Sequence, residues 1–203
     1  MRSITRRIAV AVVAGSALLT LAACGNDGGG HATGHGAPTP TASPSSSGGH
    51  NAQDVAFAQG MIPHHRQALE MARLAAGRAS SAQVKKLAVR IEKAQDPEIA
   101  TMSGWLKAWG EQVPGTGTAA HLGHTGMPGM MGEAAMDALE KASGTDFDER
   151  FLTLMVEHHR GAVEMASAER AKGAYGPATE LADAIADAQS AEISEMNGLL
   201  GTE

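Results

Sequence analysis

The chain has 203 residues, of which 43% are hydrophobic, 19% are charged and only 3% are aromatic, and its formal net charge is −6 at pH 7. A chain this acidic is a poor candidate for binding nucleic acid, and a single cysteine excludes a disulfide framework. The acidic charge favours cations as ligands instead.

The first 23 residues are typical of an export signal. Arg2, Arg6 and Arg7 precede an apolar run that ends in small residues. The next residue, Cys24, completes the sequence Leu-Ala-Ala-Cys, which resembles a bacterial lipobox, in which the cysteine is acylated. We expect residues 1–23 to be a lipoprotein signal peptide. Cys24 would then attach the chain to the outer side of the cell membrane.

Residues 24–50 are expected to form a flexible tether, because they are nearly all Gly, Ser, Thr, Pro, Ala and His and cannot bury a core. We interpret His31, His35 and His50 as incidental polar residues of this tether. The remaining residues, 51–203, have the length of one domain with a single core.

A duplication at a constant offset of 94 residues dominates the domain. Residues 54–72 share ten of nineteen identities with 148–166, and residues 84–106 share ten of twenty-three with 178–200. The domain therefore consists of two repeats and a Met/His-rich connection, at residues 51–109, 145–203 and 110–144.

All four duplicated segments are expected to be helices, because helix-forming residues dominate and apolar residues recur every three or four positions. Asn51 is followed three residues later by Asp54, and Thr145 by Asp148, which predicts matched helix starts with a capping side chain. A further short helix is expected near residues 133–141. Two helical hairpins with apolar faces are best buried against each other, so we predict an all-α four-helix bundle.

Both repeats carry the motif Met-x-x-His-His followed by a later methionine. The residues are Met61, His64, His65 and Met71 in the first repeat, and Met155, His158, His159 and Met165 in the second. On a helix, the first methionine lies one turn before the histidines, so its thioether shares a face with at least one imidazole. Both histidine pairs fall at the middle of their expected helices, and we therefore expect all four imidazoles to surround one interior site.

Copper is the metal that these side chains favour. Imidazole binds several transition metals, whereas a thioether is a soft ligand that selects Cu(I). Outside the cytoplasm, thioethers are a sensible substitute for thiolates, which would oxidise there. The connection adds further candidates, namely His121, His124, Met127, Met130 and Met131. Binding is expected to weaken below about pH 6.5, where histidine becomes protonated.

Other residues of these segments are expected to have supporting roles. Core packing is the interpretation for Met102, Met136 and Met196. Solvation, or orientation of the histidine rings, is the interpretation for Arg66, Glu70, Arg160 and Glu164.

At these motifs the chain resembles the family known as domain of unknown function 305, over about residues 50–201. The resemblance rests on MIPHHRQALEMA, MVEHHRGAVEMA and the MPGMM sequence between them. It implies a ferritin-like four-helix bundle. Because some members are associated with extracytoplasmic copper binding and copper tolerance, it also implies copper binding by the four motif histidines and the adjoining methionines.

The residues thus predict an extracytoplasmic copper buffer, carrier or tolerance factor and no enzyme. Three alternatives remain open. A carboxylate-bridged metal oxidoreductase requires Glu-x-x-His motifs, which the sequence lacks. Haem bound by histidine and methionine would be non-covalent, because no Cys-x-x-Cys-His motif is present. A metal-free interaction module would satisfy its histidines with glutamates and backbone groups.

Overall fold

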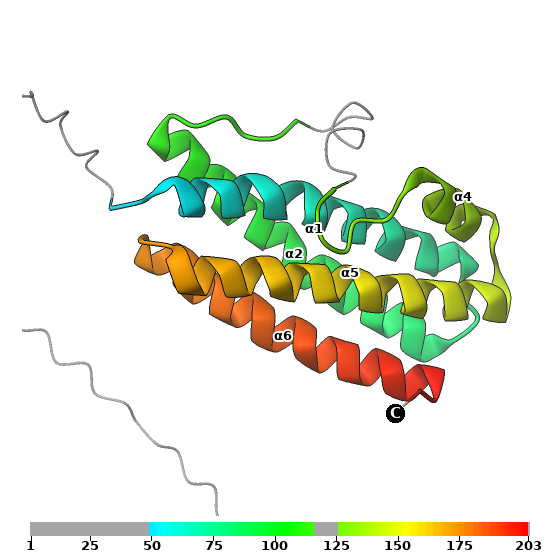
Figure 1. Ribbon diagram of the computed structural model, residues 1–203. Coiled ribbons are helices and arrows are strands. Elements are labelled where there is room, and N and C mark those ends of the chain that lie inside the picture. The colour runs from blue at the N-terminus through cyan, green and yellow to red at the C-terminus, as the bar shows by residue number, and fades with distance from the viewer. Residues whose placement is uncertain (1–48, 116–125, 203) are drawn as a thin grey trace, which may run out of the picture. The chain divides into compact units, whose positions relative to one another are not determined.

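The structure is a computed structural model that describes residues 49–115 and 126–202 (Figure 1). Five helices lie in this part of the chain: α1 (Ala52–Arg78), α2 (Ala82–Trp109), α4 (Glu133–Lys141), α5 (Gly144–Lys172) and α6 (Gly176–Leu200). Cys24, His31, His35, His121 and His124 lie outside the described residues. Within the described ranges, no helix is long and apolar enough to cross a membrane.

Two helical hairpins make up the bundle. Helix α1 packs against α2, α5 packs against α6, and the hairpins meet where α1 packs against α5. The meeting helices run antiparallel, because Ala79 after α1 pairs with Gly144 at the start of α5. At the other end, Asn51 donates a side-chain hydrogen bond to the carbonyl of Lys172, 2.8 Å away. The predicted all-α fold of paired helical hairpins is confirmed.

Helix α1 begins with the predicted capping box. The side chain of Asn51 accepts hydrogen bonds from the amides of Gln53 and Asp54, and the Asp54 carboxylate accepts one from the Asn51 amide. The matching prediction for α5 was wrong. That helix begins at Gly144, its N-cap is Ser143 without a side-chain cap bond, and Asp148 has another role.

Asp54 and Asp148, which are 94 residues apart, each accept hydrogen bonds from the turn of the opposite hairpin. Asp148 accepts hydrogen bonds from the amides of Ser80 and Ser81, in the turn between α1 and α2. Asp54 accepts the corresponding bonds from the amides of Ala174 and Tyr175, between α5 and α6. Each repeat therefore uses its aspartate to fix the turn of its partner, which explains why both acids are buried.

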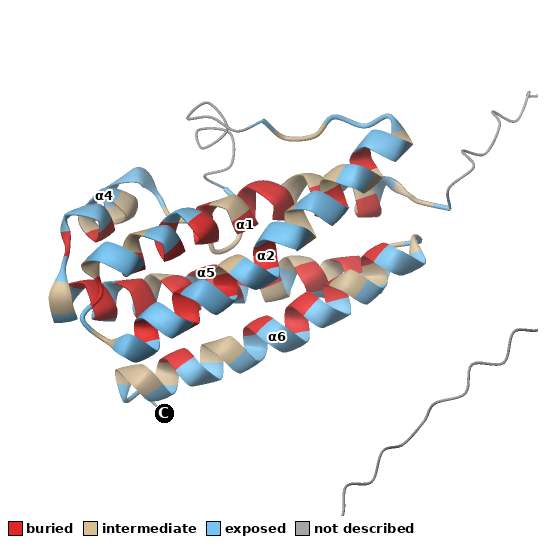
Figure 2. Ribbon diagram, turned by 180° about the vertical axis from the view of Figure 1, so that it is seen from behind, coloured by how far each residue is buried: buried red, intermediate tan, exposed pale blue. Residues whose placement is uncertain are grey.

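The apolar core consists of two separate clusters, one toward each end of the bundle. The first includes Phe57, Met61, Met102, Leu106, Ala162 and Ile185. The second includes Met71, Leu87, Ile91, Phe151, Met155 and Met196. Figure 2 shows the buried residues on the sides of the helices that face one another. Met102 and Met196 are fully buried and Met136 packs against the second cluster, which agrees with their predicted packing role.

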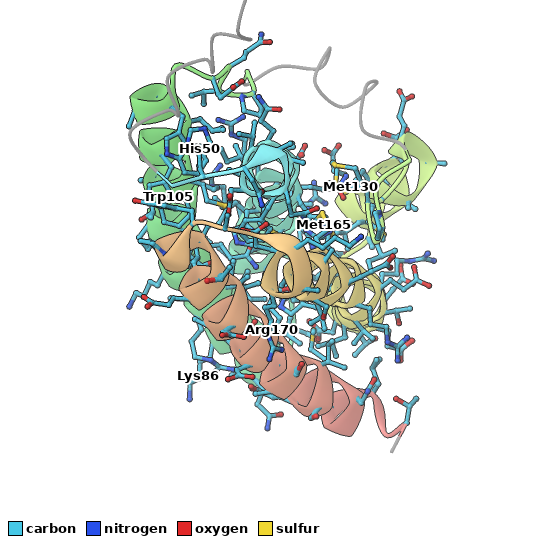
Figure 3. All side chains as sticks on the ribbon, turned by 60° about the vertical axis from the view of Figure 1, so that its left-hand side comes forward. His50, Lys86, Trp105, Met130, Met165 and Arg170 are labelled. Carbon is cyan, nitrogen blue, oxygen red and sulfur yellow. The ribbon has the colours of Figure 1, made fainter. Side chains whose placement is uncertain are left out.

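One end of the bundle carries an aromatic group. His50 stacks against Trp109 with ring centroids 4.4 Å apart, and Trp109 lies edge-on to Tyr175 at 5.2 Å. Figure 3 labels His50 and Trp105 at this end. His50 was expected to be an incidental residue of the tether. The structure corrects this, because the ring is half-buried against the domain.

Candidate metal centre

A layer of buried polar side chains separates the two apolar clusters, and every long helix contributes to it. The residues are His64 and His65 from α1, Gln95 from α2, His158 and His159 from α5, and Gln189 from α6, none more than 4% exposed. On each helix they lie between the positions that contribute to one cluster and those that contribute to the other. Buried polar groups without partners cost free energy, so this layer requires a physical reason.

His64 and His158 meet at the centre of the layer. Their ring centroids are 3.7 Å apart and their planes are inclined by 39°. Because α1 and α5 run antiparallel and each histidine pair falls near the middle of its helix, the two pairs lie at the same level. The structure therefore places both histidine pairs at one level of the bundle.

The second histidine of each pair contacts a glutamate of its own hairpin. His65 Nε2 lies 2.7 Å from Glu98 Oε2, and His159 Nε2 lies 2.7 Å from Glu192 Oε2. A carboxylate oxygen accepts, so Nε2 carries a hydrogen, and the lone pair of the neutral tautomer is then on Nδ1. This arrangement is typical of metal-binding histidines, whose second ring nitrogen donates to a carboxylate.

His64 also carries its hydrogen on Nε2. Its Nε2 lies 3.1 Å from the carbonyl oxygen of Pro128, and a carbonyl can only accept. Five buried ring nitrogens of the layer have no hydrogen-bond partner among the described residues: Nδ1 of His64, His65 and His159, and both nitrogens of His158. The layer thus holds several imidazole lone pairs that the protein does not use.

Burial also sets the charge of the central pair. Desolvation, with the nearby His65 ring, lowers the pKa of His64 to about 3 against an ordinary 6.5. Desolvation and the His64 ring hold the pKa of His158 well below its usual value. Both rings are therefore neutral over the physiological range, which is the state that binds a metal.

The four imidazoles do not form one four-nitrogen cluster, which corrects the expected geometry. His64 and His158 meet, whereas His65 and His159 are each held by a glutamate. Across the described ranges, His, Cys, Asp and Glu do not gather in groups of three or more that could hold a metal ion. A metal in this layer would therefore need thioether sulfur as well as imidazole, and that donor set fits a soft ion.

The motif methionines lie on both sides of the histidine layer. Met61 is fully buried in the cluster toward the start of α1, and Met155 is fully buried in the opposite cluster together with Met71. Met165 is half-buried, and its sulfur lies against Gly60. The antiparallel packing thus puts one Met-x-x-His pair on each side of the layer.

A short segment of the connection, residues 127–131, lies directly over this layer. A Cβ atom at Gly161 would overlap the carbonyl of Pro128, and one at Gly129 would lie 2.8 Å from the carbonyl oxygens of Glu157 and His158. Gln67 fixes the segment further, because its amide donates to the Met131 carbonyl at 2.8 Å and accepts from the Met131 amide at 2.7 Å. Residues 127–131 therefore cover the central histidines.

Several functional residues were not predicted from the sequence: Gln67, Gln95, Glu98, Gln189 and Glu192. A signal existed for four of them, because Ala-Gln-x-x-Glu occurs at residues 94–98 and again at 188–192. The residues proposed to orient the rings do not contact them. Arg66 donates to the carbonyls of Pro114 and Gly115, while Glu70, Arg160 and Glu164 are exposed.

The comparisons with known proteins identify relatives over the whole domain. The family model of DUF305, a domain of unknown function, matches residues 54–200. A DUF305 protein from Streptomyces coelicolor, described as a candidate secreted protein, is 34% identical with a TM-score of 0.66, covering 73% of this chain and 92% of its own. A DUF305 fragment from Deinococcus radiodurans is 32% identical with a TM-score of 0.66, covering 76% and 99%.

CopM in its Cu(I)-bound form is a further structural relative. It is 33% identical with a TM-score of 0.60, and the match covers 72% of this chain and 94% of CopM. CopM has also been solved with silver, with Cu(II) and in an apo form. The comparison with curated proteins found no match.

Proposed function

This chain belongs to the DUF305 family, and we propose that it is an extracytoplasmic copper-binding protein that holds the ion in its buried histidine layer. Its relationship to CopM, whose solved forms carry Cu(I), Cu(II) and silver, supports copper as the ligand. The role would be that of a buffer, carrier or tolerance factor.

The observation that carries the proposal is the set of five unpartnered, buried ring nitrogens in one layer. Leaving these groups without partners would cost stability in a purely structural core. A metal ion that accepts the lone pairs of neutral imidazoles offsets that cost. Glu98, Glu192 and the Pro128 carbonyl each contact Nε2 of one ring, in His65, His159 and His64 respectively. Nδ1 is therefore the nitrogen of these rings that is available to bind a metal.

The proposed ligands are the four layer histidines, of which His64 and His158 already meet and His65 and His159 would have to move toward the ion, with thioethers from either side. Met61 and Met155 lie one helical turn before the central histidines, so they are the first methionines we assign to the ion. Met71 and Met165 lie further along the helices, too far for one ion to touch every group, so we assign them to metal binding outside the layer. The connection supplies His121, His124, Met127, Met130 and Met131 as additional capture ligands.

We also propose that the protein is exported and anchored at Cys24. The proposal rests on the arginine-led apolar start and the Leu-Ala-Ala-Cys sequence. Cys24→Ala should move the protein from the membrane fraction to the soluble extracellular fraction. Retention of that variant in the membrane fraction would contradict an acyl anchor.

Binding rather than catalysis is the assigned role. The sequence contains no Glu-x-x-His motif, which the carboxylate-bridged metal pair of a ferritin-like oxidoreductase requires. A metal-free interaction module is the alternative, since Glu98 and Glu192 already satisfy one nitrogen each of His65 and His159. His158 argues against it, because neither of its nitrogens has a partner in the described structure.

An anaerobic titration with Cu(I), read by native mass spectrometry, tests the proposal. The wild-type protein should bind copper stoichiometrically. A variant with all four layer histidines replaced by alanine should lose the ion from the layer while keeping its helical circular dichroism. A folded quadruple variant with undiminished copper binding would overturn the assignment.

A further inference from the structure

The two repeats differ where residues 127–131 lie against the bundle. Gln67, which clamps Met131, has Gly161 as its repeat counterpart, and Gly161 is the residue that admits Pro128 and Gly129. Gly60 has Leu154 as its counterpart. The two repeats therefore differ at Gly60, Gln67 and Gly161, on the side of the bundle that residues 127–131 cover.

This one-sided contact brings two thioethers together. The sulfurs of Met127 and Met165 each lie 3.7 Å from the point where a Cβ atom of Gly60 would stand. The two sulfurs are therefore separated by at most twice that distance. A leucine at position 60, as in the other repeat, would fill this space.

The thioether pair differs from the histidine layer in exposure. Met127 and Met165 are half-buried, whereas His64 and His158 are fully buried. Figure 3 labels Met165, from α5, and Met130, from the covering segment. The thioether pair therefore belongs to residues nearer the surface than the histidines of the layer.

We propose that Met127 and Met165 form a second metal site, which takes one soft monovalent ion such as Cu(I) or Ag(I) and is distinct from the histidine layer. Thioethers are neutral, soft donors, and they do not exchange protons near neutral pH. The site therefore selects Cu(I) and Ag(I) over Cu(II) and Zn(II). Methionine has three rotatable side-chain bonds, so both sulfurs can adjust to one ion.

Gln67 is the positioning residue of this site. It touches neither sulfur, but its two hydrogen bonds to Met131 hold the segment that carries Met127. Losing both bonds frees that segment. Gln67→Ala should weaken the thioether site about tenfold while leaving both ligands in place.

Silver titration of the metal-free protein tests the proposal, with native mass spectrometry for stoichiometry and methyl NMR of ¹³C-labelled methionines for location. The M127L/M165L variant should lose one Ag(I), because leucine matches methionine in volume but cannot bind the ion. M196L is the matched control, since Met196 is fully buried in an apolar cluster, and it should bind as the wild type does. In the wild type, Ag(I) should shift the methyl signals of Met127 and Met165.

The outcomes separate this proposal from the proposed function. If the quadruple histidine variant keeps one Ag(I) that M127L/M165L loses, there are two sites. If M127L/M165L binds as many silver ions as the wild type with the same affinity, the second site does not exist. If either set of substitutions abolishes all silver binding, the residues share one site and the second-site proposal is wrong.

Discussion

His64 and His158 meet at the centre of the bundle with ring centroids 3.7 Å apart and planes inclined by 39°, yet no hydrogen bond joins either His158 nitrogen to the described protein. Two neutral imidazoles that leave three of their four ring nitrogens without a hydrogen-bond partner in the described structure are a costly way to fill a core. The same two imidazoles have unused lone pairs and lie between thioethers, so together these groups offer nitrogen and sulfur ligands for a soft metal ion.

His158→Leu should stabilise the metal-free protein by about 1–2 kcal/mol, because it removes two buried unpaired polar atoms and keeps a similar volume. The same change should remove the stabilisation that copper gives the wild type. Urea unfolding with and without Cu(I) measures both effects. His159→Leu is the control and should destabilise the metal-free protein, because it leaves the Glu192 carboxylate without its partner. A less stable H158L apo-protein would count against the layer as a metal site.

Copper binding should persist at pH 5. The sequence alone predicted weakening below about pH 6.5, the ordinary range of histidine. In the fold, burial lowers the pKa of His64 to about 3, so the neutral ligand survives through the mildly acidic range. Copper retention after dialysis at stepped pH values should fall only as the pH approaches 3. Release centred near pH 6.5 would show that the central pair does not hold the ion.

Glu98→Gln and Glu192→Gln should each weaken copper binding about tenfold or more, because a carboxylate that orients a metal-binding imidazole contributes on that scale. A competition titration with a chromophoric Cu(I) chelator measures the change. Glu70→Gln and Glu164→Gln are matched controls, since both residues also repeat but are exposed. Equal effects of all four substitutions would contradict a specific role for the two histidine–glutamate pairs.

Deprotonation of the buried Glu169 should lower the free energy of unfolding as the pH rises. Burial and the neighbouring Asp54 carboxylate raise its pKa from 4.5 to about 8. Because the folded state holds this proton more tightly than the unfolded state, the contribution is complete below about pH 4.5 and is lost as the pH rises through about 8. Glu169→Gln should flatten this part of the stability profile in urea unfolding.

The control for that experiment is Glu164→Gln, five residues earlier on α5 and exposed. It should leave the profile between pH 4.5 and 8 unchanged. A wild-type stability that rises across this range, together with an unchanged profile in E169Q, would contradict a buried protonated carboxyl.

Much of the fold could be predicted from the sequence, because the duplication makes each helix visible twice. The Asn51 capping box and the short helix at residues 133–141 also follow local rules that tertiary contacts did not override. The start of α5 did not follow them. Asp148 binds the turn at Ser80 and Ser81 instead of capping its own helix, and that contact exists only after the hairpins pack.

The site was only partly predictable. Motif spacing placed the histidines of α1 and α5 at one level, but the roles of the four rings depend on what lies opposite each one. Glu98 contacts His65, and Glu192 contacts His159. In each case the glutamate lies on the second helix of the same hairpin, 33 residues later in the sequence. Pro128 reaches His64 across 64 residues, because Gly161 leaves room for it. Such pairings are set by packing, which residue spacing along one helix does not reveal.

The most direct test of the histidine layer is long-range ¹H–¹⁵N NMR of its imidazoles, recorded on the M127L/M165L variant so that the thioether site does not compete. In the metal-free protein, His64, His65 and His159 should each carry hydrogen on Nε2, toward the Pro128 carbonyl, Glu98 and Glu192. One equivalent of Cu(I) should then shift their Nδ1 resonances and those of His158. Imidazole signals that stay unchanged when copper is bound would show that the ion lies elsewhere.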